Sequence, residues 1–195
     1  GSGKTVILTQ LLEWIWQGDE ERKADKKAVF LWLSDSPELN EQSRAKIARQ
    51  SSVFPERDLV IIEPLFSQKC LEPGKIYFLN TQKLSKTSLL TKTSDGRDYT
   101  IWQTIENTVR AGAEHVYLVI DEAHRGTKEG RIRNEAASIM QRFVKGYPEG
   151  GMNPVPLIIG MSATPERFER LVEGTSRVIR PFTINAEDVR QSGLL

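Results

Sequence analysis

The sequence has little cysteine, no long apolar run and almost no net charge, and each of these absences excludes a class of protein. Cys70 is the only cysteine, so an internal disulfide framework is excluded and a reducing compartment, the cytoplasm, is favoured. No apolar run reaches the roughly 18 residues that a membrane helix needs, so we expect no membrane partner. Because 27 basic and 26 acidic residues leave a net charge of +1, contact with nucleic acid would have to come from a local patch.

The 195 residues suffice for one α/β domain, or slightly more, with a buried core. Short apolar runs alternate with segments of helical periodicity, which is typical of a mostly parallel sheet flanked by helices. We expect strands at residues 28–33, 59–62, 76–79, 116–120, 157–161 and 178–179. We expect helices at residues 4–15, 37–50, 99–111, 132–144 and 165–173, and a polar surface loop at residues 87–98.

The chain begins with Gly1, Ser2, Gly3, Lys4 and Thr5, followed at once by helical periodicity. Glycines let the backbone curl so that several N–H groups point at one phosphate, and the positive end of the following helix adds attraction. In such a loop Lys4 would reach the β- and γ-phosphates of a nucleotide, and the Thr5 hydroxyl would bind Mg²⁺. The alternative is a Gly/Ser turn that only caps a helix. The loop pattern lacks its first residue and the preceding strand, so we expect a fragment of a longer protein.

Two adjacent carboxylates, Asp121 and Glu122, follow the apolar run at residues 116–120. If this run is a buried parallel strand, both acids lie at the carboxyl edge of the sheet, where ligands of open α/β sheets bind. Asp121 would then hold Mg²⁺, and Glu122 would orient and deprotonate the attacking water. The alternative is a strand followed by an ordinary helix cap, and the Gly-Lys-Thr segment in the same chain weakens it.

A third segment, Ser162-Ala163-Thr164-Pro165, follows the apolar run at residues 157–161. Its hydroxyl groups would lie at the same edge of the sheet as Asp121 and Glu122. However, Thr164 followed by Pro165 is by itself a good start for a helix, so this segment gains weight only from its position downstream of the acidic pair.

Taken in order, residues 1–5, Asp121-Glu122-Ala123-His124 and Ser162-Ala163-Thr164 resemble the ATP motifs of superfamily 2 helicases and translocases of the DEAD/DEAH-box kind. Residues 31–42, 79–84 and 187–195 more narrowly resemble the helicase subunit of type III restriction enzymes. The resemblance covers nearly the whole chain but only the first RecA-like domain of such proteins. It implies a RecA-like P-loop NTPase domain at residues 1–182, lacking its first strand. Residues 183–195 would start the connection to a second motor domain.

The resemblance also implies roles for single residues. Lys4 and Thr5 match the phosphate and magnesium residues of the family, and Asp121 and Glu122 match its magnesium acid and catalytic base. The positions that couple nucleotide state to movement are matched by His124, Ser162 and Thr164, although His124 fits a plain polar cap almost as well. The segments that touch the sugar–phosphate backbone of the tracked DNA strand contain Ser34, Ser36, Thr81 and Gln82.

The cofactors that the resemblance implies are ATP and Mg²⁺. The first implied partner is DNA, bound through the backbone of a single strand or as a duplex. The others are the second RecA-like domain of the parent chain and a modification (methyltransferase) subunit. That second domain supplies arginine fingers, which are worth roughly 10³–10⁵ in rate in related hydrolases. A missing interior strand would leave backbone groups unpaired, so we expect residues 1–195 alone to fold poorly and to hydrolyse little ATP.

The sequence therefore predicts the ATP-binding and hydrolysing motor domain of a DNA helicase or translocase, belonging to a type III-like restriction enzyme. Two alternatives remain open. One is a P-loop phosphotransferase of the kinase kind, which would need an acceptor pocket and no nucleic acid. The other is a nucleotide-binding scaffold without motor activity.

Overall fold

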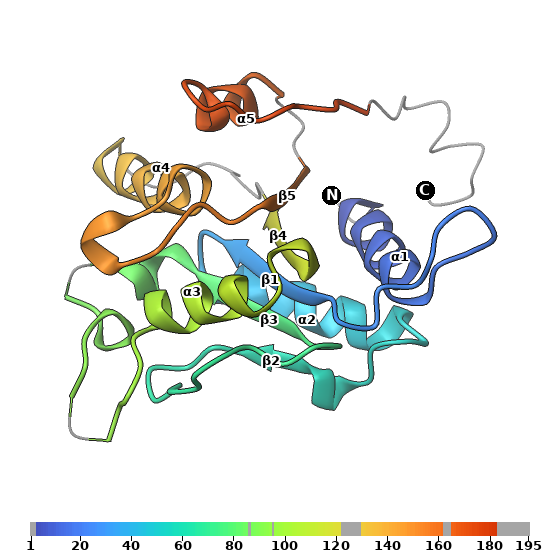
Figure 1. Cartoon of the computed structure of the whole chain (residues 1–195), viewed down its shortest axis with the longest axis horizontal. Coiled ribbons are helices and arrows are strands. Elements are labelled where there is room, and N and C mark those ends of the chain that lie inside the picture. The colour runs from blue at the N-terminus through green and yellow to red at the C-terminus, as the bar shows by residue number, and fades with distance from the viewer. Residues whose placement is uncertain (1–2, 86, 95, 122–129, 162–164, 183–195) are drawn as a thin grey trace.

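The computed structural model describes residues 3–85, 87–94, 96–121, 130–161 and 165–182. Its strands form a five-stranded sheet in the order β2-β3-β1-β4-β5, and every neighbouring pair is parallel. Helices cover both faces of this sheet (Figure 1). The expected α/β class, a parallel sheet flanked by helices, is confirmed.

The elements follow the alternation that the sequence predicts. The strands are β1 (Val29–Ser34), β2 (Leu59–Ile61), β3 (Ile76–Asn80), β4 (Val116–Asp121) and β5 (Leu157–Met161). The helices are α1 (Gly3–Gln17), α2 (Pro37–Gln50), α3 (Ile101–Ala111), α4 (Gly130–Lys145) and α5 (Pro165–Val172).

The middle strands of the sheet are apolar along their whole length because both of their faces are covered. Every residue of β1, β3 and β4 is buried. Side chains alternate between the two faces of a strand, so a sheet covered on both sides needs an unbroken apolar run. The register pairs Ser34 with Asn80 and Asp121 with Met161, which brings the carboxyl ends of four strands to one edge.

The core has one layer on each face of the sheet. On one face α1 and α2 pack against alternate residues of β1, β3 and β4; this layer includes Leu8, Leu12, Ile47, Phe30, Trp32, Phe78 and Val119. On the other face α3, α4 and α5 pack against the remaining alternate residues; this layer includes Leu31, Leu33, Leu79, Leu118, Ile105, Phe143 and Leu171.

Helix starts follow from capping chemistry. The Ser36 hydroxyl accepts a hydrogen bond from the backbone N–H of Leu39, and Pro37 occupies the first turn of α2, where its missing N–H costs nothing. At α3, Thr100 and Gln103 form a reciprocal capping box between side chains and backbone. The predicted starts at residues 37 and 99 are therefore correct to within two residues.

One expected strand is absent, and one expected loop is held more firmly than its sequence suggests. Residues 178–179 do not form a strand; the segment is held instead by Arg177, which donates to the carbonyls of Val144, Val155 and Pro156 and leaves the Val178 side chain exposed. The segment at residues 87–98 lies mostly at the surface, as expected. It is fixed by a buried guanidinium, that of Arg97, which donates to main-chain carbonyls of Pro64, Leu89 and Lys92.

The strand β5 lies at one edge of the sheet, and two of its five residues, Leu157 and Gly160, are exposed. Among the described residues no helix is both long and apolar enough to cross a membrane.

Glu106 connects α3 to the loop before β5, and from this contact we expect the stability of the fold to depend on pH. Its buried carboxylate accepts hydrogen bonds from the backbone N–H and side-chain amide of Asn153, both at 2.8 Å, and from Arg110 at 2.6 Å. Burial raises the pKa of Glu106, but these hydrogen bonds outweigh it and hold the pKa below the ordinary 4.5. A lowered folded-state pKa gives stability that is present above pH 4.5 and lost as pH falls through the folded value.

Replacing Glu106 with glutamine is therefore expected to cost about 1.5–3 kcal/mol at neutral pH, the range for hydrogen bonds to a charged group. The variant should also lose less stability than the wild type between pH 5 and pH 3, because the titrating group is gone. Urea unfolding at several pH values measures both effects, with Glu173→Gln at an exposed position as the control. An unchanged acid dependence in the Glu106 variant would show that this carboxylate is not the titrating group.

Candidate nucleotide-binding site

The first turn of α1 carries Lys4 and Thr5. The helix begins at Gly3, and the Thr5 side chain is buried at 6% exposure while the Lys4 side chain is partly exposed. One turn later the Thr9 hydroxyl donates to the Thr5 carbonyl at 2.7 Å, which fixes this turn. A Cβ added to Gly3 would meet no atom within 4 Å, so there is open space beside the helix start. The N-terminal end of this helix is a suitable place for a phosphate.

Asp121 ends β4 at the carboxyl edge of the sheet and is buried at 8% exposure. Burial raises the pKa of Asp121, which the positive charges of Lys4 and Lys46 oppose. The neighbouring charge of Asp35 raises this pKa further, and a hydrogen bond from Ser43 lowers it, with a net increase. Asp121 is thus a poorly hydrated carboxylate that a cation would stabilise, and it lies within electrostatic reach of the amine of Lys4.

The residues at this edge fit a magnesium ion carried by phosphates better than a metal held by protein alone. Mg²⁺ is usually bound through one or two carboxylates, water and substrate phosphates. Asp121 and the Thr5 hydroxyl offer such a partial set. Across the described ranges, no group of three or more His, Cys, Asp or Glu residues is arranged to hold a metal by itself.

Part of the predicted site cannot be placed. Six predicted residues lie outside the described part of the chain, and their roles stay predictions: Gly1, Ser2, Glu122, His124, Ser162 and Thr164. The described residues that precede Glu122 and Ser162 in sequence, Asp121 and Met161, are partners in the parallel register of β4 and β5.

The four residues predicted to contact DNA lie together at the carboxyl ends of β1 and β3. We call residues 34–36 the contact loop. The Thr81 hydroxyl and the Gln82 side-chain amide donate to the Asp35 carbonyl of this loop, at 3.4 and 3.2 Å. Two segments separated by more than 40 residues in sequence therefore form one surface.

The accessibility of these four side chains differs. Ser34 is completely buried, and its hydroxyl lies 2.6 Å from the Asn40 side-chain oxygen and 3.0 Å from the Ser36 carbonyl. Thr81 is buried and Ser36 caps α2, whereas Gln82 is exposed. In this structure the two serines and Thr81 shape the contact loop, and Gln82 is the side chain of this set that a ligand can reach.

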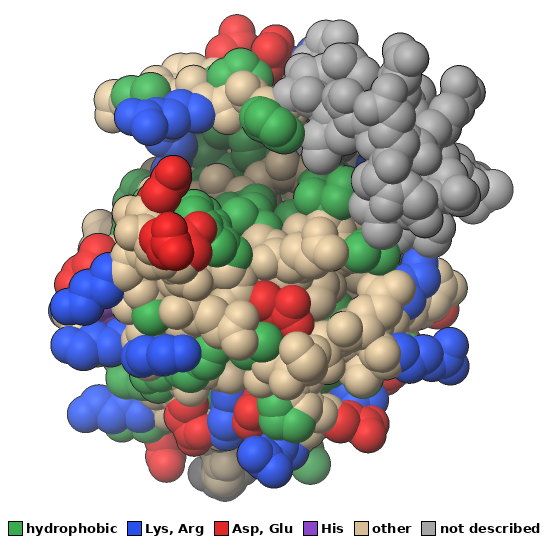
Figure 2. Space-filling view, turned by 90° about the vertical axis from the view of Figure 1, so that its right-hand side faces the viewer, with side chains coloured by type: hydrophobic (Ala, Val, Ile, Leu, Met, Phe, Trp, Pro, Cys, Tyr) green, Lys and Arg blue, Asp and Glu red, His purple; other side chains and the backbone are tan. Residues whose placement is uncertain are grey.

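The charge pattern of the surface agrees with a local, polar contact. Figure 2 shows basic and acidic side chains interspersed over the lower part of the face that it presents. That face therefore shows no extended area in which all charged side chains have the same sign. This agrees with the net charge of +1.

Sequence reasoning missed three residues of α2 that lie near this edge: Asn40, Ser43 and Lys46. Asn40 and Ser43 are buried, and with Ile47 they occupy one side of the helix. The sequence did contain a signal that could have identified them: polar residues at the buried positions of an amphipathic helix, which need polar partners.

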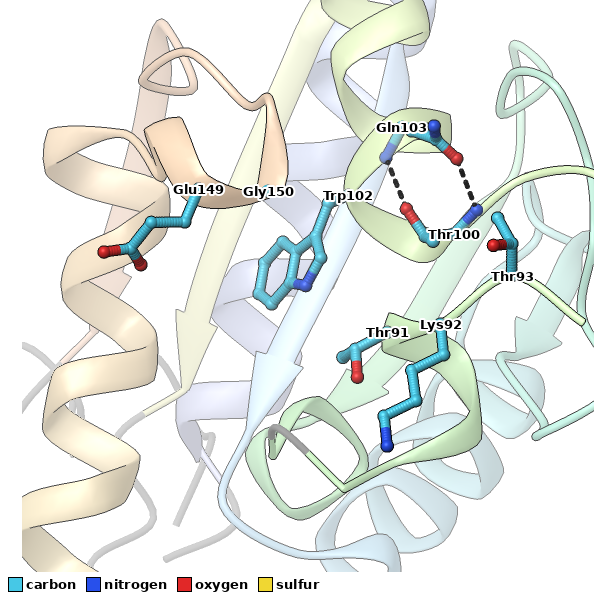
Figure 3. A pocket seen from close by; sticks show the side chains of 8 residues that line it. All are labelled: Thr91, Lys92, Thr93, Thr100, Trp102, Gln103, Glu149 and Gly150. Carbon is cyan, nitrogen blue, oxygen red and sulfur yellow. Dashed lines mark hydrogen bonds between the residues drawn. The ribbon is translucent and has the colours of Figure 1, made fainter.

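A separate hollow of about 380 Å³ lies at the N-terminus of α3 (Figure 3). Three of its polar side chains already bind the protein's own backbone: Thr100 and Gln103 form the capping box, and the Thr91 hydroxyl donates to carbonyls of Ser85 and Ser88. Trp102 packs against Phe143 and Tyr147, so these two rings cover one side of its indole. The other lining residues are Lys92, Thr93, Glu149 and Gly150. None of the predicted site residues lines this hollow.

Comparison with known families identifies the family of this chain. A family model described as the type III restriction enzyme, res subunit, matches residues 1–167, which include Lys4, Thr5, Asp121 and the contact loop. The chain belongs to this family. The comparison with curated proteins gives no match. The family comprises ATP-dependent helicases, so its domains bind ATP, and membership implies binding of nucleic acid. The expected resemblance to the helicase subunit of type III restriction enzymes is confirmed.

Proposed function

We propose that this domain is the ATP-hydrolysing motor of a DNA helicase or translocase within a type III-like restriction enzyme. The observation that carries the proposal is the meeting of two sets of residues at one edge of the sheet. Asp121 ends β4, and the contact loop begins at the end of the neighbouring strand β1, because Leu33 pairs with Ile120 in the parallel register. The positive charge of Lys4, in the first turn of α1, acts on Asp121 as well. A motor needs its nucleotide site next to its DNA site, because hydrolysis must be coupled to movement along the DNA.

Each residue has a distinct task in this proposal. Lys4 binds the β- and γ-phosphates and balances negative charge that develops during transfer. Thr5 and Asp121 would hold Mg²⁺, and a bound Mg²⁺ would supply positive charge against the phosphate oxygens. Glu122 takes the proton of the attacking water. His124, Ser162 and Thr164 couple nucleotide state to movement.

The DNA contact in this proposal is made to the sugar–phosphate backbone. The exposed amide of Gln82 and the first N–H groups of α2, capped by Ser36, are donors suited to phosphate oxygens. Backbone contact carries no base sequence, so the same grip works at every step along the DNA. A second RecA-like domain would close the nucleotide site and supply an arginine, and a methyltransferase subunit would supply site recognition.

The test is steady-state ATP hydrolysis by the full-length protein, with and without single-stranded and duplex DNA. We expect Mg²⁺-dependent hydrolysis that DNA stimulates, and a linear loss of log DNA affinity with log salt. Hydrolysis that DNA does not stimulate, with phosphate transferred to a small acceptor, would favour a phosphotransferase. Binding of ATP without any turnover would favour a scaffold. Either result would reject the motor.

A further inference from the structure

The hollow at the N-terminus of α3 lies at the same edge of the sheet as the contact loop. The chain leaves β3 at the carboxyl edge, and α3 ends just before β4 begins. Because β3 and β4 both run parallel to β1, β4 begins at the opposite edge. An 11-residue helix is about 16 Å long, close to the roughly 20 Å of a six-residue strand, so α3 spans the sheet. Its N-terminus is therefore near the carboxyl edge.

Two hydrogen bonds connect the contact loop with the wall of the hollow. The Gln82 side-chain amide donates to the Asp35 carbonyl of the contact loop at 3.2 Å. Gln82 belongs to the short helix Thr81–Leu84, and Ser85 follows this helix directly. The Thr91 hydroxyl, in the wall of the hollow, donates to the Ser85 carbonyl at 3.1 Å. The expected DNA contact and the hollow therefore adjoin each other on one surface.

One side of the hollow presents hydrogen-bond donors (Figure 3). We call it the donor side and define it by Thr91, Lys92, Thr93, Thr100 and Gln103. Thr100 and Gln103 each use a side-chain oxygen to accept a backbone N–H, which leaves the Thr100 hydroxyl and the Gln103 amide free to donate. The Lys92 ammonium is exposed and forms no ion pair with any described residue. The Glu149 carboxylate, which also lines the hollow, points away from the donor side.

A buried positive charge is bonded to the main chain of the donor side. Arg97 is only 6% exposed, and its guanidinium donates to the carbonyls of Leu89 and Lys92. Its Nε is buried without a hydrogen-bond partner, and no carboxylate in the described part of the chain pairs with it. Burial of a charge is costly unless an opposite charge compensates it. An anion held on the donor side would therefore be attracted by Arg97 as well as by Lys92.

We propose that the donor side binds a phosphate group of the DNA strand that also touches the contact loop. This inference rests on the proposed motor function. The hollow of about 380 Å³ falls within the range of about 300–1,000 Å³ that ligand sites occupy. Hydroxyl, amide and ammonium donors suit phosphate oxygens and read no base sequence. A single contact leaves a strand free to swing, whereas contacts at the contact loop and at the donor side fix its direction across the domain.

The experiment measures binding of fluorescent single-stranded DNA to the full-length protein by anisotropy at several salt concentrations. Lys92→Ala removes one cation from a phosphate, so the slope of log affinity against log salt should become shallower by about 0.7. The affinity should fall by about 5-fold at about 0.1 M salt, equally for strands of different sequence. Thr93→Val removes a neutral donor, so it should lower the affinity by about 2–10-fold without changing the slope.

Matched variants separate a contact in the hollow from a general effect of charge. Lys27→Ala removes the same charge from an exposed position just before β1, at the opposite edge of the sheet, and should leave affinity and slope unchanged. Lys92→Arg keeps the charge and should keep the wild-type slope. Circular dichroism checks that each variant is folded, and Lys92→Gln takes the place of Lys92→Ala if the alanine variant is not.

The outcomes are distinguishable. If the wild-type protein does not bind DNA, the proposed function itself fails. If the wild type binds DNA and the Lys92→Ala protein keeps its affinity and slope, the motor stands and the DNA contact in the hollow is overturned. An equal loss in the Lys27→Ala protein would also overturn this contact, because net charge would then control binding. Binding of inorganic phosphate that depends on Lys92, with unchanged DNA binding, would assign the hollow to a free anion instead.

Discussion

Replacing Lys4 with alanine is expected to lower ATP hydrolysis by about 10²–10³-fold, the cost of removing one group that stabilises developing charge in a transition state. ATP affinity should fall as well, by about 10–100-fold, since a hydrogen bond to a charged group contributes about 1.5–3 kcal/mol. Both effects follow from the place of Lys4 in the first turn of α1, within electrostatic reach of Asp121. Steady-state kinetics and titration with a fluorescent ATP analogue measure the two losses.

The matched control for this prediction is Lys23→Ala, which removes the same charge from an exposed position in the segment between α1 and β1. It should leave both the rate and the ATP affinity unchanged. Normal ATP binding by the Lys4 variant would remove the basis for the phosphate site. A comparable defect in the Lys23 variant would instead indicate that net charge, and not the position of Lys4, controls binding.

Replacing Glu122 with glutamine is expected to lower kcat by about 10²–10⁴-fold, which is the usual contribution of a general base. Mg-ATP binding should be retained, because the amide has nearly the shape of the carboxylate and the proposed phosphate and metal ligands, Lys4, Thr5 and Asp121, are unchanged. The two replacements therefore differ in kind. The Lys4 change reduces binding and turnover together, whereas the Glu122 change separates them.

Glu149→Gln is the control for the Glu122 variant, since it changes the same chemical group at the rim of the hollow near α3. It should hydrolyse ATP at the wild-type rate. If the Glu122 variant also hydrolyses ATP normally, then Glu122 is not the base, and another group must deprotonate the attacking water. That result would leave the binding roles of Lys4 and Asp121 intact.

The parts of the fold that could be predicted are those in which local sequence and burial agree. The runs that became β1 and β4 are continuous and apolar because both faces of the sheet are covered, and few other structures require that pattern. The start of α2 follows from Ser36 and Pro37 alone, since a hydroxyl before a proline satisfies the helix end locally. In these cases the deciding contacts lie within a few residues in sequence.

The parts that could not be predicted depend on contacts between distant segments. Val178 and Ile179 look like a strand, but Arg177 binds three carbonyls from segments over 20 residues away and no strand forms. Arg97 would ordinarily be assigned to the surface, yet it is buried among carbonyls of Pro64 and Leu89. A cation that replaces an apolar core residue leaves no periodic signal in the sequence.

The candidate site divides in the same way. The positions of Lys4 and Thr5 at the start of α1 and of Asp121 at the end of β4 could be predicted, because phosphate and metal chemistry restrict both residue type and order along the chain, and their roles stay predictions. The contribution of α2 could not, because Ser43 and Lys46 reach Asp121 only through the packing of α2 beside β1. The burial of Ser34 was also unforeseen; its hydroxyl bonds within the protein and supports the contact loop, and its contact with DNA stays a prediction.

The most direct test of the central claim is a crystal structure of the full-length protein with Mg²⁺ and a non-hydrolysable ATP analogue. We expect the metal to bind the Thr5 hydroxyl and to lie beside the Asp121 carboxylate, directly or through one water. We expect the Lys4 ammonium to hydrogen-bond to the β- and γ-phosphates. Phosphates bound away from the N-terminus of α1, or a metal remote from Asp121, would contradict the account.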